Sequence, residues 1–355
     1  DPTTRPRCAP MIDERSPDRT AGELLETLRV ATGRADIAFD RVPVPLMGGF
    51  YADMLRFSIV DPPPGLDGEL VARLVPDPAA GAWEATIQRD VAEQGFPTPA
   101  VRLTAPESGP LGRYLIVMDL VDGSPPMSGL STRVLLTEVP GLLRHLPGEL
   151  ARCAADLHAL DPGPLGGALA ALPTPFPLTT AGFVEQLRRD AAEVGRADLD
   201  VAAKRLLASE PASETVVISH GDLHPFNLLQ TADGPVLIDW TVARIAHPGF
   251  TVGFTHLLLS NPPIPLPGAA RPAMRAVGRG MARRFLSRYR RLTDGTPGEV
   301  SDEQLDWHRQ VHALRILVEK ARWHIQGLSP EPGHPWYTLE PFATKVLGLH
   351  DRRGK

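Results

Sequence analysis

Residues 216–240 read VVISHGDLHPFNLLQTADGPVLIDW, and this stretch decides the fold. Two apolar runs within it, 216–218 and 236–238, are typical of short buried strands, and each ends in polar groups. A third short apolar run at 227–229 and the turn sequence ADGP at 232–235 lie between them. The pattern predicts a tight strand corner with its polar residues gathered at the strand ends.

Three oxygen-bearing side chains stand at these strand ends, and we expect the corner to bring Asp222, Asn227 and Asp239 close together. Phosphoryl transfer to a hydroxyl needs such a set. One carboxylate orients the attacking hydroxyl, while an amide oxygen and a second carboxylate hold hard cations against the phosphate charge. The alternative is a purely structural loop with scattered acids and a capping Asn. The complete arrangement of the three residues favours a catalytic site.

The spacing also resembles a known pattern. His220 and Asp222, followed by Asn227, match the protein-kinase catalytic loop H-R-D-x-x-x-x-N, with Gly221 in place of Arg. Asp239 follows the next strand, where a kinase has its metal-binding Asp. The run HGDLHPFN followed by IDW resembles the aminoglycoside phosphotransferase / choline kinase-like family of small-molecule kinases.

The resemblance implies an α+β, bilobal protein-kinase-like fold with a small antiparallel β lobe and a larger helical lobe. It implies ATP as phosphate donor, with GTP not excluded, Mg²⁺ as cofactor, and a small-molecule hydroxyl as acceptor. Asp222 would be the catalytic residue, and Asn227 and Asp239 the metal ligands. A carboxylate of ordinary pKa, about 3.9, is a weak base. Asp222 would therefore orient the hydroxyl and accept its proton late, with His220 and His224 supporting the loop.

The resemblance extends to a nucleotide-binding lobe upstream. Gly48 and Gly49 stand between two alternating stretches and could fold a backbone loop over phosphates, although a plain hairpin turn fits equally well. The strand predicted at 69–75 carries Arg73, where kinases have a phosphate-binding Lys. Glu84, on a helix expected from Trp83 to Gly95, would pair with Arg73, and Glu93 is the alternative partner.

The stretch 113–121 is apolar and strand-like, and the turn residues 122–125 end it. The resemblance implies that this stretch is the last strand of the small lobe and the hinge. In the resemblance, backbone groups from Asp119 to Val121 would bind the adenine edge, and Met118 would line the purine pocket. Ordinary core filling explains Met118 equally well.

One segment departs from the family pattern. Relatives continue after the IDW motif with Gly-Asp-Pro and then Asp-Leu-Ala, whereas this chain has AHPGFTVG at 246–253. Both acids are missing close to the expected metal site. This departure keeps a second reading open, a nucleotide-binding pseudokinase with little or no turnover.

Composition sets the broader limits. The chain has 355 residues and a net charge of −5, which gives no overall basic footprint for nucleic acid. Two cysteines and the lack of a long apolar run favour a reduced cytoplasmic protein without a membrane span. We expect a flexible tail at 1–20, a nucleotide-binding lobe at 21–118, and a helical catalytic and substrate lobe at 119–355. An Arg-rich helix at 270–289 is most simply a solvated face.

The sequence leaves the acceptor open among amino alcohols, sugars, macrolides and metabolites. Mild net charge and the lack of an evident acid cluster argue against polycationic aminoglycosides. A long helix at 302–327 is a candidate wall of the acceptor cleft, with Asp302, Asp306 and Glu319 among its acids.

Overall fold

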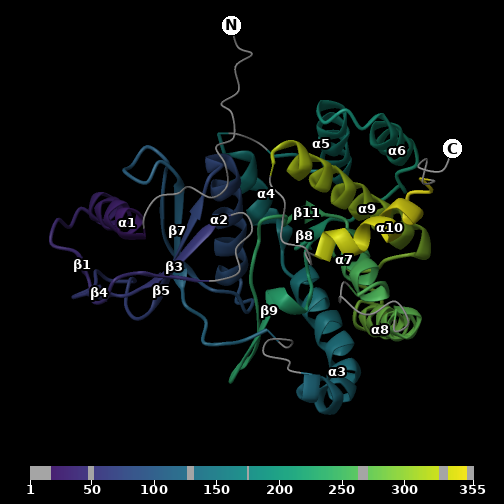
Figure 1. The fold of residues 1–355 in the computed structure, drawn as a ribbon, viewed down its shortest axis with the longest axis horizontal. Helices are drawn as coiled ribbons and strands as arrows, with labels where there is room; N and C mark the ends of the chain where they lie inside the picture. Colours follow the sequence, from purple (N-terminus) through teal and green to yellow (C-terminus); the bar gives the residue numbers. More distant parts are fainter. Residues whose placement is uncertain are drawn as a thin grey trace, which may run out of the picture. The chain divides into compact units, whose positions relative to one another are not determined.

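The computed structural model describes residues 17–46, 52–125, 132–173, 176–262, 271–327 and 335–349 (Figure 1). The predicted glycine loop, with Gly48 and Gly49, lies outside these residues. The chain divides into two compact units. One takes Asp1–Asp122 with Ala168–Phe176, and the other takes Gly123–Gly167 with Pro177–Lys355. The predicted lobe boundaries stay predictions.

The first unit is built on a five-stranded antiparallel sheet of order β2-β3-β5-β7-β6. Its strands are β2 (Val44–Pro45), β3 (Asp53–Phe57), β5 (Leu70–Val75), β7 (Tyr114–Asp119) and β6 (Val101–Ala105). A separate two-stranded pair joins β1 (Ala38–Phe39) to β4 (Ile59–Val60). Two helices belong to this unit, α1 (Pro17–Thr32) and α2 (Pro78–Glu93).

The central strand β5 is buried on both faces, which explains its continuous apolar run. Leu70, Ala72 and Leu74 alternate toward a core that includes Leu24 and Leu28 of α1. The intervening residues of β5 face a second core, which Ala85 of α2 completes. The sheet therefore carries one helix on each face, and α2 is held against the strand that carries Arg73.

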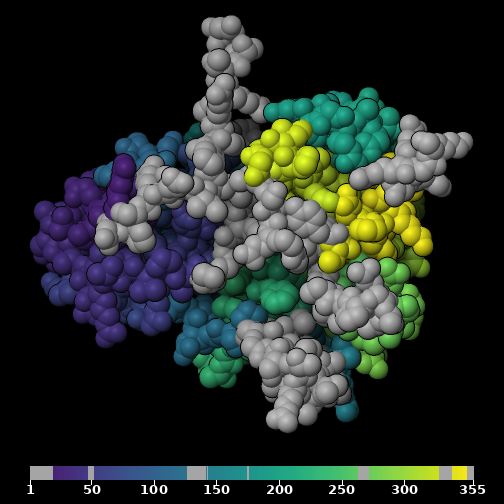
Figure 2. Space-filling model, in the orientation of Figure 1, coloured from purple at the N-terminus to yellow at the C-terminus, as the bar shows by residue number. Residues whose placement is uncertain are grey.

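The second unit is mainly helical. Its helices are α3 (Thr132–His158), α5 (Thr180–Glu193), α6 (Ala197–Ala208), α7 (Gly249–Ser260), α8 (Arg271–Leu292), α9 (Asp302–Ile325) and α10 (Pro335–Val346), and α4 (Pro162–Ala170) crosses the division between the units. Figure 2 shows the teal atoms of α5 and α6 beside the yellow atoms of α9, in agreement with their packing. Among the described residues, no helix is long and apolar enough to cross a membrane.

Two short antiparallel pairs frame the decisive stretch. The strand β8 (Val217–Ser219) pairs with β11 (Arg244–Ala246), and β9 (Leu228–Thr231) pairs with β10 (Gly234–Leu237). The expected small antiparallel sheet and larger helical part are both confirmed. The loop between β8 and β9 carries the predicted catalytic residues.

The structure also corrects several element boundaries. The helix α2 starts five residues before Trp83, because the Asp77 side chain accepts the backbone N–H groups of Ala79 and Ala80 and Pro78 fits the first turn. The helix α4 forms in a stretch rich in Gly and Pro, residue types that disfavour helix interiors. Propensity is a weak guide where packing decides.

Candidate active site

The loop after β8 depends on a glycine at position 221. Gly221 has φ +72°, in the left-handed region, and an added Cβ would lie 2.3 Å from a ring carbon of Phe250. The backbone conformation and the packing both require glycine. This explains why Gly221 stands where protein kinases have Arg.

Side chains of the helices α7 and α9 hydrogen-bond to the backbone of this loop. Thr251 Oγ1 on α7 accepts the His220 N–H at 2.9 Å, and Thr255 Oγ1 donates to the Leu223 carbonyl at 2.8 Å. From α9, Arg315 Nη1 donates to the Gly221 carbonyl at 2.9 Å. These bonds satisfy buried backbone groups of the loop and fix its path.

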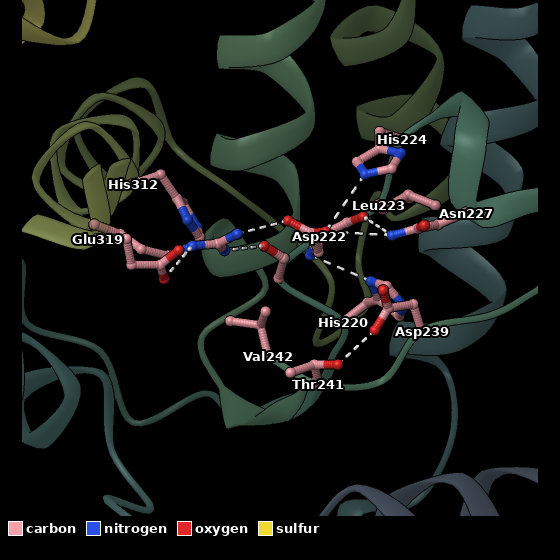
Figure 3. Close-up of polar contacts among 12 residues, drawn as sticks. His220, Asp222, Leu223, His224, Asn227, Asp239, Thr241, Val242, His312 and Glu319 are labelled. Atoms are coloured by element: carbon pink, nitrogen blue, oxygen red, sulfur yellow. Dashed lines mark hydrogen bonds and ion pairs between the residues drawn. The ribbon is translucent and has the colours of Figure 1, made fainter. Parts of the chain in front are cut away.

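Asp222 lies where this loop turns, with three side chains around its carboxylate (Figure 3). Arg315 Nη2 is 2.6 Å from Oδ1, His224 Nε2 is 3.4 Å from Oδ2, and Asn227 Nδ2 donates to Oδ2 at 3.3 Å. Burial alone would raise the pKa of Asp222, but the charge of Arg315 and the hydrogen bond from His224 together lower it well below its usual range. Asp222 is therefore a carboxylate at neutral pH.

His220 joins the loop to the end of β10. Its Nε2 donates to the Ile238 carbonyl at 3.1 Å, and its Nδ1 accepts the Asp222 N–H at 3.2 Å. Burial lowers the pKa of His220 to about 4, although the charges of Asp222 and Asp239 partly oppose this. The neutral ring suits this bonding pattern, since one nitrogen must donate and the other accept.

His224 has a similar local role. Its Nδ1 accepts the Phe226 N–H at 3.2 Å and caps the short 3-10 turn Pro225–Asn227. Its other ring nitrogen faces Asp222. The ring thus connects the turn that presents Asn227 to the carboxylate of Asp222.

Asn227 and Asp239 come from the two ends of the β9–β10 hairpin. The Ile238 N–H donates to the Asn227 carbonyl at 2.9 Å, so the two segments are joined directly before Asp239. Asp239 has φ +66°, a conformation that is costly outside glycine, and its Oδ1 accepts the Thr241 hydroxyl. Figure 3 shows Asp222, Asn227 and Asp239 gathered around His220.

The donor chemistry of this group fits a hard cation. A carboxylate and an amide oxygen are ligands that Mg²⁺ accepts, with phosphate and water completing its shell. The described residues contain no group of three or more His, Cys, Asp or Glu side chains that could hold a metal by themselves.

The segment that lacks the family acids opens the helix α7. Thr251 supplies, through its hydroxyl, the acceptor that caps the His220 N–H. His247 Nδ1 accepts the Gly249 N–H at 3.0 Å, and its ring stacks on His308 with centroids 5.1 Å apart. Neutral groups thus meet the local hydrogen-bonding needs of this segment, and burial lowers the pKa of His247 to about 4.

In the first unit, Arg73 and Glu84 form a buried ion pair. Arg73 Nε on β5 lies 2.9 Å from Glu84 Oε1 on α2, with the two side chains 7% and 3% exposed. Glu93, the alternative partner, is exposed at the end of α2. Burial of both charges makes the geometry of the pair demanding, since desolvation must be offset by close contact.

Two of the three backbone N–H groups from Asp119 to Val121 already donate hydrogen bonds to other backbone carbonyls. The Asp119 N–H donates to the Ala100 carbonyl, and the Leu120 N–H donates to the Glu69 carbonyl. The Val121 N–H is the member of this trio without a backbone partner among the described residues. Met118 is buried, and its sulfur accepts Gln88 Nε2 at 3.5 Å.

The most important residue that the sequence did not reveal is Arg315. It is 3% exposed, its guanidinium carbon lies 4.9 Å from the centre of the Phe254 ring, and its Nε lies 3.4 Å from Glu319 Oε1. A single Arg inside the apolar run ALRILV, with Glu four residues later, was the available signal. A cation in such a run needs a buried partner, and that partner is Asp222.

Comparison with known proteins gives a consistent picture. The model of a family described as the phosphotransferase enzyme family matches residues 55–285. A comparison with curated proteins finds no match to this sequence.

Solved structures share the fold at low sequence identity. A candidate aminoglycoside phosphotransferase from Ralstonia eutropha JMP134 has a TM-score of 0.63 at 18% identity, over 91% of this chain and 97% of that one. A choline/ethanolamine kinase family protein from Mesorhizobium loti has 0.55 at 16%, over 94% and 96%. A spectinomycin phosphotransferase, solved with ADP and spectinomycin, has 0.53 at 13%, over 92% and 97%. The expected kinase-like fold is confirmed.

Proposed function

The chain belongs to the phosphotransferase enzyme family, and from this premise we propose that it transfers the γ-phosphate of ATP, with Mg²⁺, to a hydroxyl of a small molecule. The observation that carries the proposal is the contact of Asp222 with Asn227, 3.3 Å apart, on a loop bonded to the segment before Asp239. Phosphoryl transfer depends mainly on positioning and on charge stabilisation, which such a group can supply.

Asp222 would orient the acceptor hydroxyl. Its pKa lies well below the usual range because Arg315 and His224 outweigh the effect of burial, so it is a weak base. A weak base cannot remove a proton from a hydroxyl of much higher pKa early in the reaction. We assign to Asp222 a hydrogen bond to the hydroxyl, and acceptance of its proton as the bond to phosphorus forms.

Asn227 and Asp239 would hold Mg²⁺ through the amide oxygen and the carboxylate. The bound ion would supply positive charge against the phosphate oxygens. The Thr241 hydroxyl bonds one Asp239 oxygen, so this side chain is oriented before any ligand arrives. The left-handed backbone of Asp239 supports the same assignment, since strain of this kind gathers at functional sites.

Arg73 would contact the nucleotide phosphates, with Glu84 holding its guanidinium in place. The buried pair on β5 and α2 supports this role. Within the hinge, the Val121 N–H is the favoured donor to the purine edge, since the N–H groups of Asp119 and Leu120 are used inside the sheet. The proposed phosphate contact of Gly48 and Gly49 rests on the sequence alone.

Three of the four acids of α9 are paired with arginines, and this pairing bears on the acceptor class. Asp302 pairs with Arg290, Asp306 with Arg309, and Glu319 with Arg315. A polycationic aminoglycoside would have to compete with three arginines for these carboxylates. We therefore propose a neutral or weakly charged hydroxyl compound as acceptor.

One observation favours a second candidate, a nucleotide-binding protein with little turnover. Arg315 occupies one oxygen of Asp222 at 2.6 Å, and Asn227 and His224 contact the other, so an acceptor hydroxyl would have to compete for this carboxylate. A screen of the pure protein with Mg²⁺, ATP or GTP and a library of hydroxyl compounds separates the two candidates. Transfer of phosphate to one compound class supports the kinase, and nucleotide binding without transfer to any compound supports the alternative.

A further inference from the structure

The helix α8 has an unusual charge pattern for a chain of net charge −5. Within Arg271–Leu292 it carries eight arginines and no acidic residue. Several of these arginines follow one another at spacings of four residues, where like charges repel along a helix face. A bound anion beside this helix would reduce the repulsion between its arginines and so stabilise it.

Four of the eight arginines of α8 line a cavity. A cavity of about 620 Å³ lies between α3 and α8, which pack against each other (Figure 1). Arg144 of α3 lines one side, and Arg283, Arg284, Arg288 and Arg291 of α8 line the other. The residues that line it include no Asp or Glu, so its charge is strongly positive.

The arginines that line the cavity have no carboxylate partner among the residues that the structure describes. In the described part of the chain, Arg144, Arg283, Arg284 and Arg288 make no ion pair with a carboxylate. Their neighbour Arg290 differs, since it lies 2.7 Å from Asp302 and outside the cavity lining. The charges that face the cavity therefore remain available to a ligand.

A buried contact joins the two helices that line the cavity. Tyr289 on α8 donates its hydroxyl proton to the Gly298 carbonyl at 2.5 Å. His158 Nδ1 on α3 lies 2.7 Å from the Tyr289 hydroxyl oxygen. This ring nitrogen must donate, because the single hydroxyl proton goes to Gly298. The buried Met281 lines the floor. The arginines are thus presented from two helices held in one arrangement.

From these observations we propose that the α3–α8 cavity binds a compact small molecule that carries two or more adjacent phosphate groups. Guanidinium groups match phosphate oxygens with paired hydrogen bonds, which an ammonium group cannot do. The volume lies in the range of small-molecule sites, about 300–1,000 Å³. A concave site between two helices suits a compact anion better than a membrane surface or a nucleic-acid duplex. None of its lining residues belongs to the loop that carries Asp222.

Calorimetric titration with inorganic tripolyphosphate tests this proposal. The titration is made at low salt with EDTA, in the Asp239→Ala background, so that the proposed metal-dependent nucleotide site contributes little. We expect saturable binding near one equivalent. The double variant Arg284→Ala/Arg288→Ala should weaken it at least tenfold. The matched control Arg275→Ala/Arg279→Ala removes two exposed arginines of the same helix outside the cavity, and should change the affinity less than twofold.

Further arms separate the possible sources of the phosphate groups. Adenosine triphosphate that competes with tripolyphosphate would indicate a nucleotide tail as ligand, and failure to compete would indicate a free polyphosphate. Either result supports the site if the Arg284/Arg288 variant weakens it. Equal losses in both double variants would overturn the proposal. So would saturable binding to phosphatidylserine vesicles without binding of tripolyphosphate, or no binding of either probe. Circular dichroism confirms that both double variants are folded.

Discussion

Arg315 Nη2 lies 2.6 Å from Asp222 Oδ1, and Nη1 of the same guanidinium donates to the Gly221 carbonyl at 2.9 Å. One side chain of α9 therefore holds both the backbone and the carboxylate of a loop 93 residues away in sequence. The proposed catalytic loop depends on helix packing in the large unit as well as on its own sequence. Glu319 and the ring of Phe254 in turn position the guanidinium.

Replacing Arg315 should damage both stability and the proposed chemistry. Arg315→Ala leaves Asp222 without its cation, and removal of one partner of a buried pair typically costs about 3–5 kcal/mol. The pKa of Asp222 should rise, so the acid limb of the pH–rate profile should move to higher pH. Urea unfolding and a pH profile of phosphate transfer measure the two effects.

The matched control for this variant is Arg309→Ala. Arg309 pairs with Asp306 on the same helix, where Asp306 is largely exposed. Loss of an exposed pair should cost at most about 1 kcal/mol. Equal losses in the two variants would show that the contact with Asp222 has no special importance.

Gly221 should not tolerate a side chain. Gly221→Ala combines a left-handed backbone with a Cβ only 2.3 Å from the Phe250 ring, so the loop or the ring must move. We expect a loss of at least about 2 kcal/mol of unfolding free energy and a large drop in phosphate transfer. Gly167→Ala is the control, because its Cβ would meet nothing within 4 Å on a helix. Wild-type activity in Gly221→Ala would show that the loop path is not fixed.

The Arg73–Glu84 pair should matter for the nucleotide more than for the acceptor. Glu84→Gln removes the carboxylate that holds the guanidinium, so the KM for ATP should rise by about tenfold, equivalent to about 1.4 kcal/mol. Glu93→Gln, at an exposed position of the same helix, should leave it unchanged. Steady-state kinetics with each substrate varied in turn decides between them. A rise confined to the KM of the acceptor would contradict the assignment.

Buried histidines should make the protein sensitive to mild acid. Burial lowers the pKa values of His220, His247 and His256 to about 4, and that of His158 to about 3. In the unfolded chain these rings have a pKa of about 6.5. Below that value the unfolded state binds more protons, so stability is complete above pH 6.5 and falls toward pH 4.

The expected slope is about 1.4 kcal/mol per pH unit for each such ring within that window. Urea unfolding at several pH values between 7 and 4.5 measures the slope. The half-buried His256 can be replaced with little disturbance of the core. His256→Gln should lower the slope of stability against pH by the contribution of one ring. A stability that is constant from pH 7 to 5 would mean that these rings bind protons equally in the folded protein and in the unfolded chain, and would contradict the lowered pKa values.

Local patterns predicted much of the molecule. The apolar run of β5 and the turn between β9 and β10 are encoded in neighbouring residues, so these strands and the corner were foreseeable. The Asp222–Asn227 contact follows from spacing within one loop. Their proposed roles, and the domain limits, remain predictions.

Long-range contacts could not be predicted in this way. Arg315 meets Asp222 because α9 packs beside α7, and a single sequence does not specify that packing. The helix α4 forms from residues of low helix propensity. The charge of α8 was visible in the sequence, but the cavity that gathers four of its arginines with Arg144 depends on the position of α3.

The central claim is that the oxygens of Asp222, Asn227 and Asp239 together hold the acceptor, the metal and the triphosphate. Its most direct test is the transfer of labelled γ-phosphate, with nucleotide binding measured in parallel, for wild type, Asp222→Ala and Asp239→Ala. We predict that Asp222→Ala loses transfer while it binds Mg²⁺-nucleotide almost as tightly as wild type. Asp239→Ala should lose that metal-dependent binding. Transfer at the wild-type rate by Asp222→Ala would contradict the claim.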